Sequence, residues 1–310
     1  MTSTSDPRDL RTELESLTTE AFRPDLADID RLPTLDIARL MNGEDATVAA
    51  AVAARLPLIA AAIDAVADRM ARGGRLVYAG AGTAGRLGVL DASECPPTFN
   101  TDPSRVVGLI AGGPDALITS VEGAEDSREL ARADLERLAL TPDDTVVGIS
   151  ASGRTPYAIG AVEHARARGS LTVGLACNPG SPLAAAADHG IEIVVGPELL
   201  TGSTRLKAGT AQKLVLNMLS TITMIRLGKT YGNLMVDVRA SNDKLRARSH
   251  RIVALATGAQ DKEIEEALTA TDGEVKHAIL TILAGVDGPT AAKLLAASDG
   301  HLRAALAAAG

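Results

Sequence analysis

The sequence predicts an α/β fold, a three-layer α/β/α sandwich around a parallel sheet, with a small all-helical unit at the C-terminus. Short apolar runs alternate with helical patterns through the middle of the chain. These runs are rich in β-branched residues and apolar on both faces, which is typical of parallel strands covered by helices on both sides. Beyond about residue 242 only short helical patterns occur, so the C-terminal unit contains no strand.

The elements follow in order along the chain. Residues 1–45 are expected to form an N-terminal helical arm of short helices and turns, and residues 44–72 repeat apolar side chains at helical spacing. The expected strands are 75–82, 105–113, 144–152, 171–178 and 191–198. Residues 207–228 then predict one long helix that ends at a glycine. We expect the arm over 1–45, the α/β domain over 46–241 and the helical domain over 242–310.

The C-terminal domain is predicted from four breaks between helical patterns. They are "TG" (257–258), "TDGE" (271–274), "VDGP" (286–289) and "SDG" (298–300). Each break supplies a helix N-cap or a turn residue. Several short helices joined in this way predict a small helical domain of the UBA-like kind.

Composition restricts the function. The chain has 310 residues, enough for a core without disulfide or metal, and only 2% aromatic residues, so the core must be aliphatic. The formal net charge of -8 opposes nucleic-acid binding, which needs a basic surface. No apolar run is long enough to cross a bilayer, so no membrane partner is expected.

The cysteine and histidine content bears on location and metals. Two cysteines do not make a disulfide framework, and the polar N-terminus lacks the apolar segment of a signal peptide, so a cytoplasmic protein is expected. The five histidines show no metal-ligand spacing, and no metal site is predicted.

Two strand-to-helix loops have the composition of an anion site. "GAGTAGRLG" (80–88) contains Gly-x-Gly-x-x-Gly, but a dinucleotide site would need an acidic residue at the end of a following strand, and none is well placed. "SASGRTP" (150–156) offers the hydroxyls of Ser150, Ser152 and Thr155, while Gly153 lets the backbone approach a ligand. A strand, a hydroxyl-rich loop and a helix N-terminus together favour binding of a phosphate ester. A plain strand–helix connection with N-caps remains the alternative for each loop.

The segment "VEGAEDSRE" (121–129) gathers four acidic residues, Glu122, Glu125, Asp126 and Glu129. Acids are common in the first turn of a helix, where they meet the positive end of its dipole. From composition alone this structural role is the better interpretation, and catalysis by one of the carboxylates is the alternative.

Six segments identify a family resemblance. They are "GAGTAGRLGVLDASECPPTF" (80–99), "VEGAEDSRE" (121–129), "SASGRTPY" (150–157), "CNPGSPL" (177–183), "TGSTRLKAGTAQKLVLNMLST" (201–221) and "GNLMVDV" (232–238). Together they closely resemble the N-acetylmuramic acid 6-phosphate etherases, which are built on the sugar isomerase (SIS) domain. The resemblance runs from about Leu17 into the C-terminal helices. It implies that residues 46–241 form a SIS sugar-phosphate domain.

The resemblance implies an activity and assigns residues to it. The family cleaves the lactyl ether of its sugar phosphate to N-acetylglucosamine 6-phosphate and D-lactate in cell-wall sugar recycling, as a homodimer that needs neither metal nor cofactor. Glu125 matches the family's catalytic base and Glu94, in "DASE", its general acid. The Pro96–Pro97 pair after Glu94 is expected to end its helix, which would leave Glu94 near a loop. The residues that match the sugar-phosphate site are Gly82, Thr83, Ser150, Ser152, Gly153 and Thr155. The family usually has Ser in the first loop where this chain has Ala84.

The chemistry explains why two carboxyl groups are needed. In the open-chain sugar the lactyl oxygen on C3 lies β to the C1 aldehyde, so removal of the C2 proton allows lactate to leave and water to add. A base near C2 and an acid near the C3 oxygen each contribute roughly 10²–10⁴-fold to the rate. Lys207, the first residue of the long helix, has two equally weighted interpretations, a solvated helix-start lysine and a substrate contact. Cys95 is interpreted as a buried small residue and not as a nucleophile.

Two rival functions share the expected fold. A sugar-phosphate isomerase would need one Glu to move a proton between C1 and C2, whereas the second acid in "DASECPPTF" favours the etherase. A non-catalytic sugar-phosphate sensor is the other rival. The glucokinase regulatory protein has tandem SIS domains, but 310 residues hold only one. Residues 1–45 also lack the basic helix-turn-helix of a DNA-binding sensor.

Overall fold

The computed structural model describes residues 14, 16–238 and 243–310. It divides into two compact units, one formed by Met1–Ala92 with Val106–Leu219 and the other by Ser93–Arg105 with Ser220–Gly310. The predicted boundary between residues 241 and 242 lies outside the described residues. The predicted limits of the three domains therefore stay a prediction.

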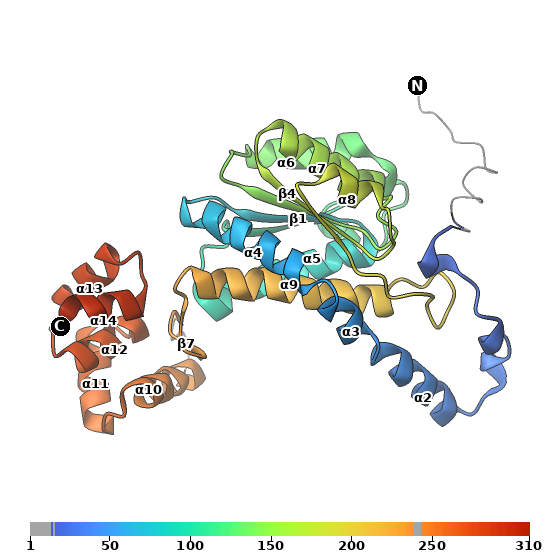
Figure 1. The fold of residues 1–310 in the computed structure, drawn as a ribbon. Coiled ribbons are helices and arrows are strands. Elements are labelled where there is room, and N and C mark those ends of the chain that lie inside the picture. The colour runs from blue at the N-terminus through green and yellow to red at the C-terminus, as the bar shows by residue number, and fades with distance from the viewer. Residues whose placement is uncertain (1–13, 15, 239–242) are drawn as a thin grey trace. The chain divides into compact units, whose positions relative to one another are not determined.

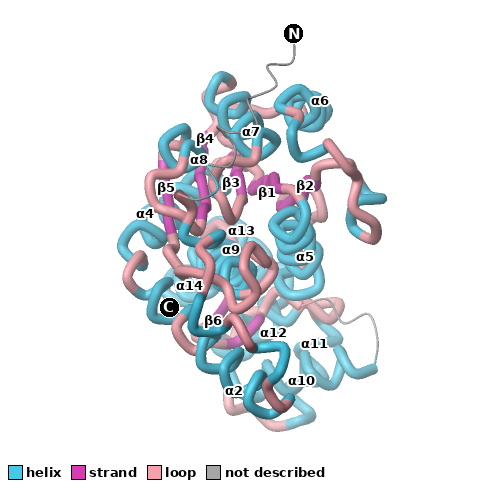
Figure 2. Tube along the Cα trace, turned by 90° about the vertical axis from the view of Figure 1, so that its right-hand side faces the viewer, coloured by secondary structure: helices cyan, strands magenta, loops and turns pink. Residues whose placement is uncertain are grey.

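The first unit contains a five-stranded sheet in which every pair of neighbours is parallel, as predicted. Figure 2 shows the strands side by side in the order β2-β1-β3-β4-β5. They are β1 (Leu76–Gly80), β2 (Val106–Ile110), β3 (Thr145–Ile149), β4 (Leu171–Ala176) and β5 (His189–Glu192). The chain passes from β1 outward to β2 and then back across β1 to β3, so the winding direction reverses between β1 and β3.

Helices cover both faces of this sheet, which confirms the three-layer architecture. Figure 1 shows α6, α7 and α8 over one face and α4, α5 and α9 over the other. Their bounds are α4 (Leu56–Ala71), α5 (Gly82–Phe99), α6 (Arg128–Leu138), α7 (Pro156–Ala167), α8 (Pro182–Ala186) and α9 (Lys207–Arg226). Every residue of β1, β3 and β4 is buried, because these strands have helices on both sides.

The described residues of the predicted arm, 14 and 16–45, form short helices. They are η1 (Thr18–Glu20), η2 (Pro24–Leu26), η3 (Ile29–Arg31) and α2 (Thr34–Asp45), and α3 (Val48–Ala53) follows beyond the predicted limit of the arm. The helix α2 buries none of its residues. Two more short turns, η4 (Pro114–Leu117) and η5 (Ala124–Asp126), lie between β2 and α6.

Two local expectations need correction. The last strand was expected over 191–198, but β5 ends at Glu192. Ile193 N still donates a hydrogen bond to Ala176 O at 2.9 Å, and the chain then leaves the sheet. Pro96 and Pro97 were expected to end their helix, yet both lie inside α5. Proline fixes φ at a helical value, so one further turn forms although two N–H donors are missing.

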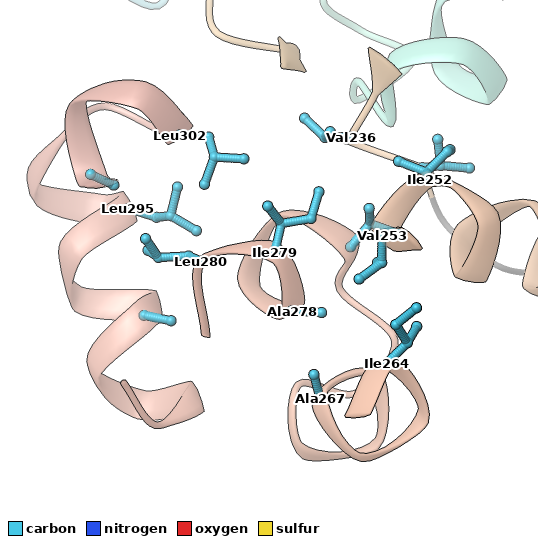
Figure 3. Packing of buried hydrophobic residues seen from close by; sticks show 14 residues of the cluster. Val236, Ile252, Val253, Ile264, Ala267, Ala278, Ile279, Leu280, Leu295 and Leu302 are labelled. Atoms are coloured by element: carbon cyan, nitrogen blue, oxygen red, sulfur yellow. The ribbon is translucent and has the colours of Figure 1, made fainter. Parts of the chain in front are cut away.

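The second unit has an aliphatic core of its own (Figure 3). A hairpin of β6 (Thr230–Tyr231) and β7 (Leu234–Met235) precedes five helices, α10 (Asp243–Thr257), α11 (Asp261–Ala270), α12 (Val275–Ala284), α13 (Gly288–Ala297) and α14 (Leu302–Ala309). The side chains of Val253, Ile279 and Leu302 are among those buried at its centre. All four predicted breaks fall at the boundaries between consecutive helices of this set, whereas the hairpin was not predicted.

Among the described residues, no single helix has the length and apolar character to cross a membrane. Two bent pairs reach that length together, Thr34–Ala53 with Leu56–Ala71 and Val275–Ala284 with Gly288–Ala297.

Candidate active site

Four loops begin side by side at the carboxyl edge of the sheet. Gly80, the last residue of β1, is in register with Ile110 of β2 and with Ile149 of β3, and Ile149 is in register with Leu175 of β4. The loops that follow these four strands therefore start next to one another. Ligands of parallel α/β sheets bind at this edge, where the winding direction reverses, which here is between β1 and β3.

The loop after β3 is arranged around the hydroxyl of Ser150. This hydroxyl lies 2.7 Å from Thr155 Oγ1 and 3.2 Å from Ser152 Oγ, and it accepts a hydrogen bond from Gly153 N at 3.0 Å. Ser152 Oγ accepts one from Arg154 N at 3.1 Å. The structure thus brings Ser150, Ser152, Gly153 and Thr155 together immediately before α7. The first N–H groups of a helix have no partner within the helix and attract anions.

Gly153 permits the tight path of this loop. Its φ is +71°, in the left-handed region, and a Cβ atom there would lie 2.3 Å from Ser181 Cβ. Ser181 cannot withdraw, because its hydroxyl accepts from Ala184 N at 3.1 Å and caps α8. A side chain at residue 153 would therefore displace the loop.

The loop after β1 supplies the start of α5. Gly82 has a φ of +52° and no atom near the position of a Cβ, and Thr83 follows it in the first turn. The methyl of Thr83 lies 3.5 Å from where a Cβ of Gly209 would be, so α5 and α9 start close together. Ala84, where the family usually has Ser, is buried at 7% exposure.

Glu125 lies in η5, on the loop that follows β2. Its neighbour Ala124 is buried in a cluster with Ala79 of β1 and Tyr157 of α7, while Glu125 itself is exposed. The turn is thus fixed next to the end of β1 and the first turn of α7. Glu125 is therefore an exposed carboxylate on a turn that packs against the start of α7.

Most members of the acidic cluster lie outside the first turn of α6, and two of them, Glu125 and Asp126, lie in the short helix η5. The helix α6 begins at Arg128, and Ser127 caps it by accepting from Leu130 N at 3.0 Å. Glu122, Glu125 and Asp126 precede this cap, and only Glu129 lies in the first turn. Arg128, the first residue of α6, pairs with Glu163.

Glu94 lies in α5, the helix that begins at Gly82. Its side chain is exposed, while the neighbouring Asp91 and Cys95 are buried. Asp91 accepts from Tyr78 Oη at 2.7 Å and from Asn217 Nδ2 at 2.7 Å, which fixes this part of α5 against β1 and α9. Glu94 follows in the same helix and not in the loop that the two prolines predicted.

Lys207 is neither solvated nor a simple helix-start residue. Its side chain is 5% exposed, and Nζ lies 2.5 Å from Glu44 Oε2, whose other oxygen accepts from Arg23 Nη1 at 2.9 Å. Hydrogen bonds from Lys207 and then Arg23 lower the pKa of Glu44. Sequence reasoning missed Glu44, because nothing in a sequence connects residues 163 positions apart.

Glu198 is a second residue that the sequence did not reveal. It is fully buried, and its two oxygens accept from Lys207 N at 2.9 Å and Ala208 N at 3.0 Å. A carboxylate at this position offsets the positive end of the α9 dipole. The start of α9 is therefore already neutralised by the protein, whereas the loops before α5 and α7 carry no such acid among the described hydrogen bonds.

Asn178 is the third residue missed. It follows β4 at the same edge and is 1% exposed, and its amide bonds the N-terminal arm and the loop after β3. Its position directly after a strand was a usable signal, since functional residues gather at this edge.

The cysteines are free and buried, as expected of Cys95. Burial, with a smaller contribution from Glu198, raises the pKa of Cys177 to about 12, so its thiol stays protonated. In the part of the chain that the structure describes, no group of three or more His, Cys, Asp or Glu side chains is placed to hold a metal ion.

Comparisons with known proteins identify the relatives of this chain. Residues 58–166 match the glucokinase regulatory protein N-terminal SIS domain, and residues 128–222 match the SIS domain. An N-acetylmuramic acid 6-phosphate etherase of Streptomyces avermitilis is 85% identical over 309 residues, covering 100% of this chain and 99% of its own. The same enzyme of Rubrobacter xylanophilus is 61% identical, covering 94% and 97%. A solved phosphoheptose isomerase from Neisseria gonorrhoeae has a TM-score of 0.48 at 16% identity, covering 62% of this chain and 98% of its own.

Proposed function

The chain belongs to the N-acetylmuramic acid 6-phosphate etherases, and from this premise we propose which residues perform the reaction and how. The enzyme cleaves the lactyl ether of N-acetylmuramic acid 6-phosphate and gives N-acetylglucosamine 6-phosphate and D-lactate, in peptidoglycan recycling. The near-complete match to etherases of the same length carries this conclusion.

The proposed reaction is an elimination followed by hydration. The sugar reacts as its open-chain aldehyde. A base removes the C2 proton, the electron pair forms the C2–C3 double bond, and the C3–O bond breaks as an acid protonates the departing lactate oxygen. Water then adds to C3, and a proton returns to C2. No oxidant or reductant is required.

Glu125 is proposed as the base at C2. It is an exposed carboxylate on a turn that Ala124 anchors beside β1 and α7. A general base must be anchored so that it meets the proton it removes. Glu125 lies outside the first turn of α6, so it does not serve as a helix-start acid for that helix.

Glu94 is proposed as the acid at the C3 oxygen. Its side chain is exposed on α5, whose start carries Gly82 and Thr83 of the proposed sugar-phosphate site. The bonds of Tyr78 and Asn217 to Asp91 hold the helix one turn before it. Two carboxyl groups in different surroundings can act as base and acid at one pH.

The hydroxyls of Ser150, Ser152 and Thr155, with Gly153, are proposed to bind the 6-phosphate, together with Gly82 and Thr83. The hydroxyls of Ser152 and Thr155 both lie within hydrogen-bond distance of the Ser150 hydroxyl, directly before the N-terminus of α7. Hydroxyl donors and free helix N–H groups are the usual ligands of a phosphate ester.

A homodimer is also proposed. The helix α2 buries none of its residues, although a helix of 12 residues is marginal in water without packing. Its Leu35 is 59% exposed, and Ile37 and Met41 line an apolar pocket of about 280 Å³ with Leu200 and Leu206. A second copy of the chain would cover this surface.

The cellular location is proposed to be the cytoplasm. Both cysteines are free thiols, which is usual in a reducing compartment. The net charge of -8 favours a small-molecule substrate over nucleic acid.

The test of this function is an assay of the purified protein with N-acetylmuramic acid 6-phosphate. We expect stoichiometric D-lactate and N-acetylglucosamine 6-phosphate. An isomerase would give a ketose phosphate without lactate, and a sensor would bind the sugar without changing it.

A further inference from the structure

We propose that Asn178, held by Thr18 and Thr19 of the N-terminal arm, is a positioning residue for the phosphate loop, residues 150–155. The inference rests on the proposed binding of the 6-phosphate by this loop. It assigns the arm a role in substrate affinity, although the arm contributes no residue to the proposed catalytic pair.

The side-chain amide of Asn178 makes hydrogen bonds through all of its polar positions. Nδ2 donates to Thr19 Oγ1 at 2.9 Å and to Ala151 O at 3.0 Å. Oδ1 accepts from Thr18 Oγ1 at 2.9 Å and from Thr19 N at 3.4 Å. Asn178 is 1% exposed and Thr19 is fully buried. No other side chain of similar size offers two donors and two acceptors in this arrangement.

Ala151 is the point at which this network reaches the phosphate loop. Its carbonyl lies between Ser150 and Ser152 in the chain and accepts from Asn178 Nδ2 and also from Cys177 N, at 2.9 Å. A peptide group held by two donors cannot rotate freely. The directions of the Ser150 and Ser152 side chains are set by the backbone on either side of this group.

The arm is also attached to the start of α9. Glu44, in the last turn of α2, pairs with Lys207, and Arg23 joins the same carboxylate. The arm is therefore held at two points, at Asn178 after β4 and at Lys207 at the start of α9. A segment fixed in this way supports the geometry of the loops without contacting the substrate.

This hydrogen-bond network is expected to affect substrate affinity separately from the rate of the chemical step. Loss of the bond between Asn178 and Thr19 loosens the hold on Ala151, so the hydroxyls of Ser150 and Ser152 are less well aligned for the phosphate. The proposed base and acid, Glu125 and Glu94, make no contact with this network among the described hydrogen bonds. Substrate affinity should therefore fall while the rate of the chemical step is kept.

The test compares Thr19→Val, which removes the hydroxyl at nearly constant volume, with Thr19→Ser, which keeps it. For Thr19→Val we expect KM for N-acetylmuramic acid 6-phosphate and the inhibition constant of inorganic phosphate to rise together about three- to tenfold, the usual range for one hydrogen bond. We expect the kcat of Thr19→Val to differ from that of the wild type by less than about twofold. Thr19→Ser should restore both constants.

The matched control is Thr172→Val, at a position that is also fully buried. Its hydroxyl donates to Asp188 Oδ2 at 2.7 Å and accepts from Asp188 N at 2.9 Å, and it lies near the start of β4 instead of its end. We expect this variant to lose thermal stability without a change in KM or in the inhibition constant of phosphate.

Two results overturn the proposal, and they are distinguishable. If Thr19→Val changes neither constant while Ser152→Ala weakens binding, the loop binds phosphate but Asn178 and the arm do not position it. If Ser152→Ala also leaves KM and the inhibition constant of phosphate unchanged, residues 150–155 do not bind the phosphate. The positioning role of Asn178 is then excluded as well. Equal increases in KM for Thr19→Val and Thr172→Val also contradict the proposal, because they indicate general destabilisation.

Discussion

The ammonium group of Lys207 lies 2.5 Å from the carboxylate of Glu44, 163 positions earlier in the chain. The Lys207 side chain is 5% exposed and that of Glu44 23%. Since an unpaired buried charge is strongly unfavourable, the buried ammonium of Lys207 depends on Glu44, whose carboxylate also pairs with Arg23. This pair connects the N-terminal arm to the first residue of α9.

The first prediction concerns Glu44→Gln. The pKa of Glu44 is lowered in the folded protein, first by Lys207 and then by Arg23. Its contribution to stability is therefore complete above the ordinary Glu pKa of about 4.3 and is lost as the pH falls from there through the lowered pKa. At pH 7 the variant should be less stable by about 1.5–3 kcal/mol.

Urea unfolding at pH 7 and at lower pH measures this effect. The difference between the wild type and Glu44→Gln should shrink as the pH drops below about 4.3. Glu163→Gln is the control, since its pair with Arg128 is half exposed and is expected to contribute less than about 1 kcal/mol. A deficit that does not change with pH would contradict the ionic role of Glu44.

The second prediction separates the two carboxylates. Glu125→Gln should nearly abolish exchange of the C2 proton with solvent, because an amide cannot act as the base. Glu94→Gln should slow lactate release and still allow C2 exchange, because deprotonation does not require the acid. Proton NMR in heavy water measures exchange, and a lactate assay measures release. Equal and mild losses in both variants would remove both catalytic assignments.

The third prediction is the isotope pattern of the product. In heavy water the N-acetylglucosamine 6-phosphate should carry deuterium at C2, and in ¹⁸O-labelled water the label should enter the C3 hydroxyl. Both follow from proton removal at C2 and breakage of the C3–O bond. Mass spectrometry of the product detects each label. Retention of the original oxygen at C3 would exclude elimination and hydration.

The fourth prediction concerns the phosphate loop. Ser152→Ala removes one hydroxyl, and a hydrogen bond to a charged group is worth about 1.5–3 kcal/mol, so substrate binding should weaken roughly ten- to a hundredfold. The unphosphorylated sugar should bind wild type and variant alike. Ser170→Ala is the control, because Ser170 is buried and donates to Thr141 O at 2.7 Å, before the start of β4. If Ser152→Ala lowers only the melting temperature, the loop has a capping role alone.

The fifth prediction concerns the surface of α2. Leu35→Glu places a charge on a side chain that is 59% exposed in the single chain, so the fold of one subunit should be little affected. If a second copy covers this surface, the variant should dissociate to monomers at concentrations where the wild type is dimeric. Sedimentation equilibrium measures the difference. An unchanged mass would place the subunit contact elsewhere.

The sequence predicted those features that depend on neighbours in the chain. β1, β3 and β4 were recognised because burial on both faces leaves a continuous apolar run, and Gly228 marked the end of the long helix. The hydroxyls of Ser150, Ser152 and Thr155 were recognised because they share one loop. Pairings such as Lys207 with Glu44 and Asn178 with Thr19 could not be predicted, since they arise only when the folded sheet brings distant segments together.

The attachment of the arm to Asn178 has a consequence for protein synthesis. Thr19 leaves the ribosome 159 residues ahead of its partner, which at about 5–20 residues per second is a delay of roughly 8 to 30 s. During that time the nascent arm has no folded surface to join, and Phe22, which is 65% exposed even afterwards, is accessible to chaperones. The first part of the chain to be made is therefore among the last to reach its final place.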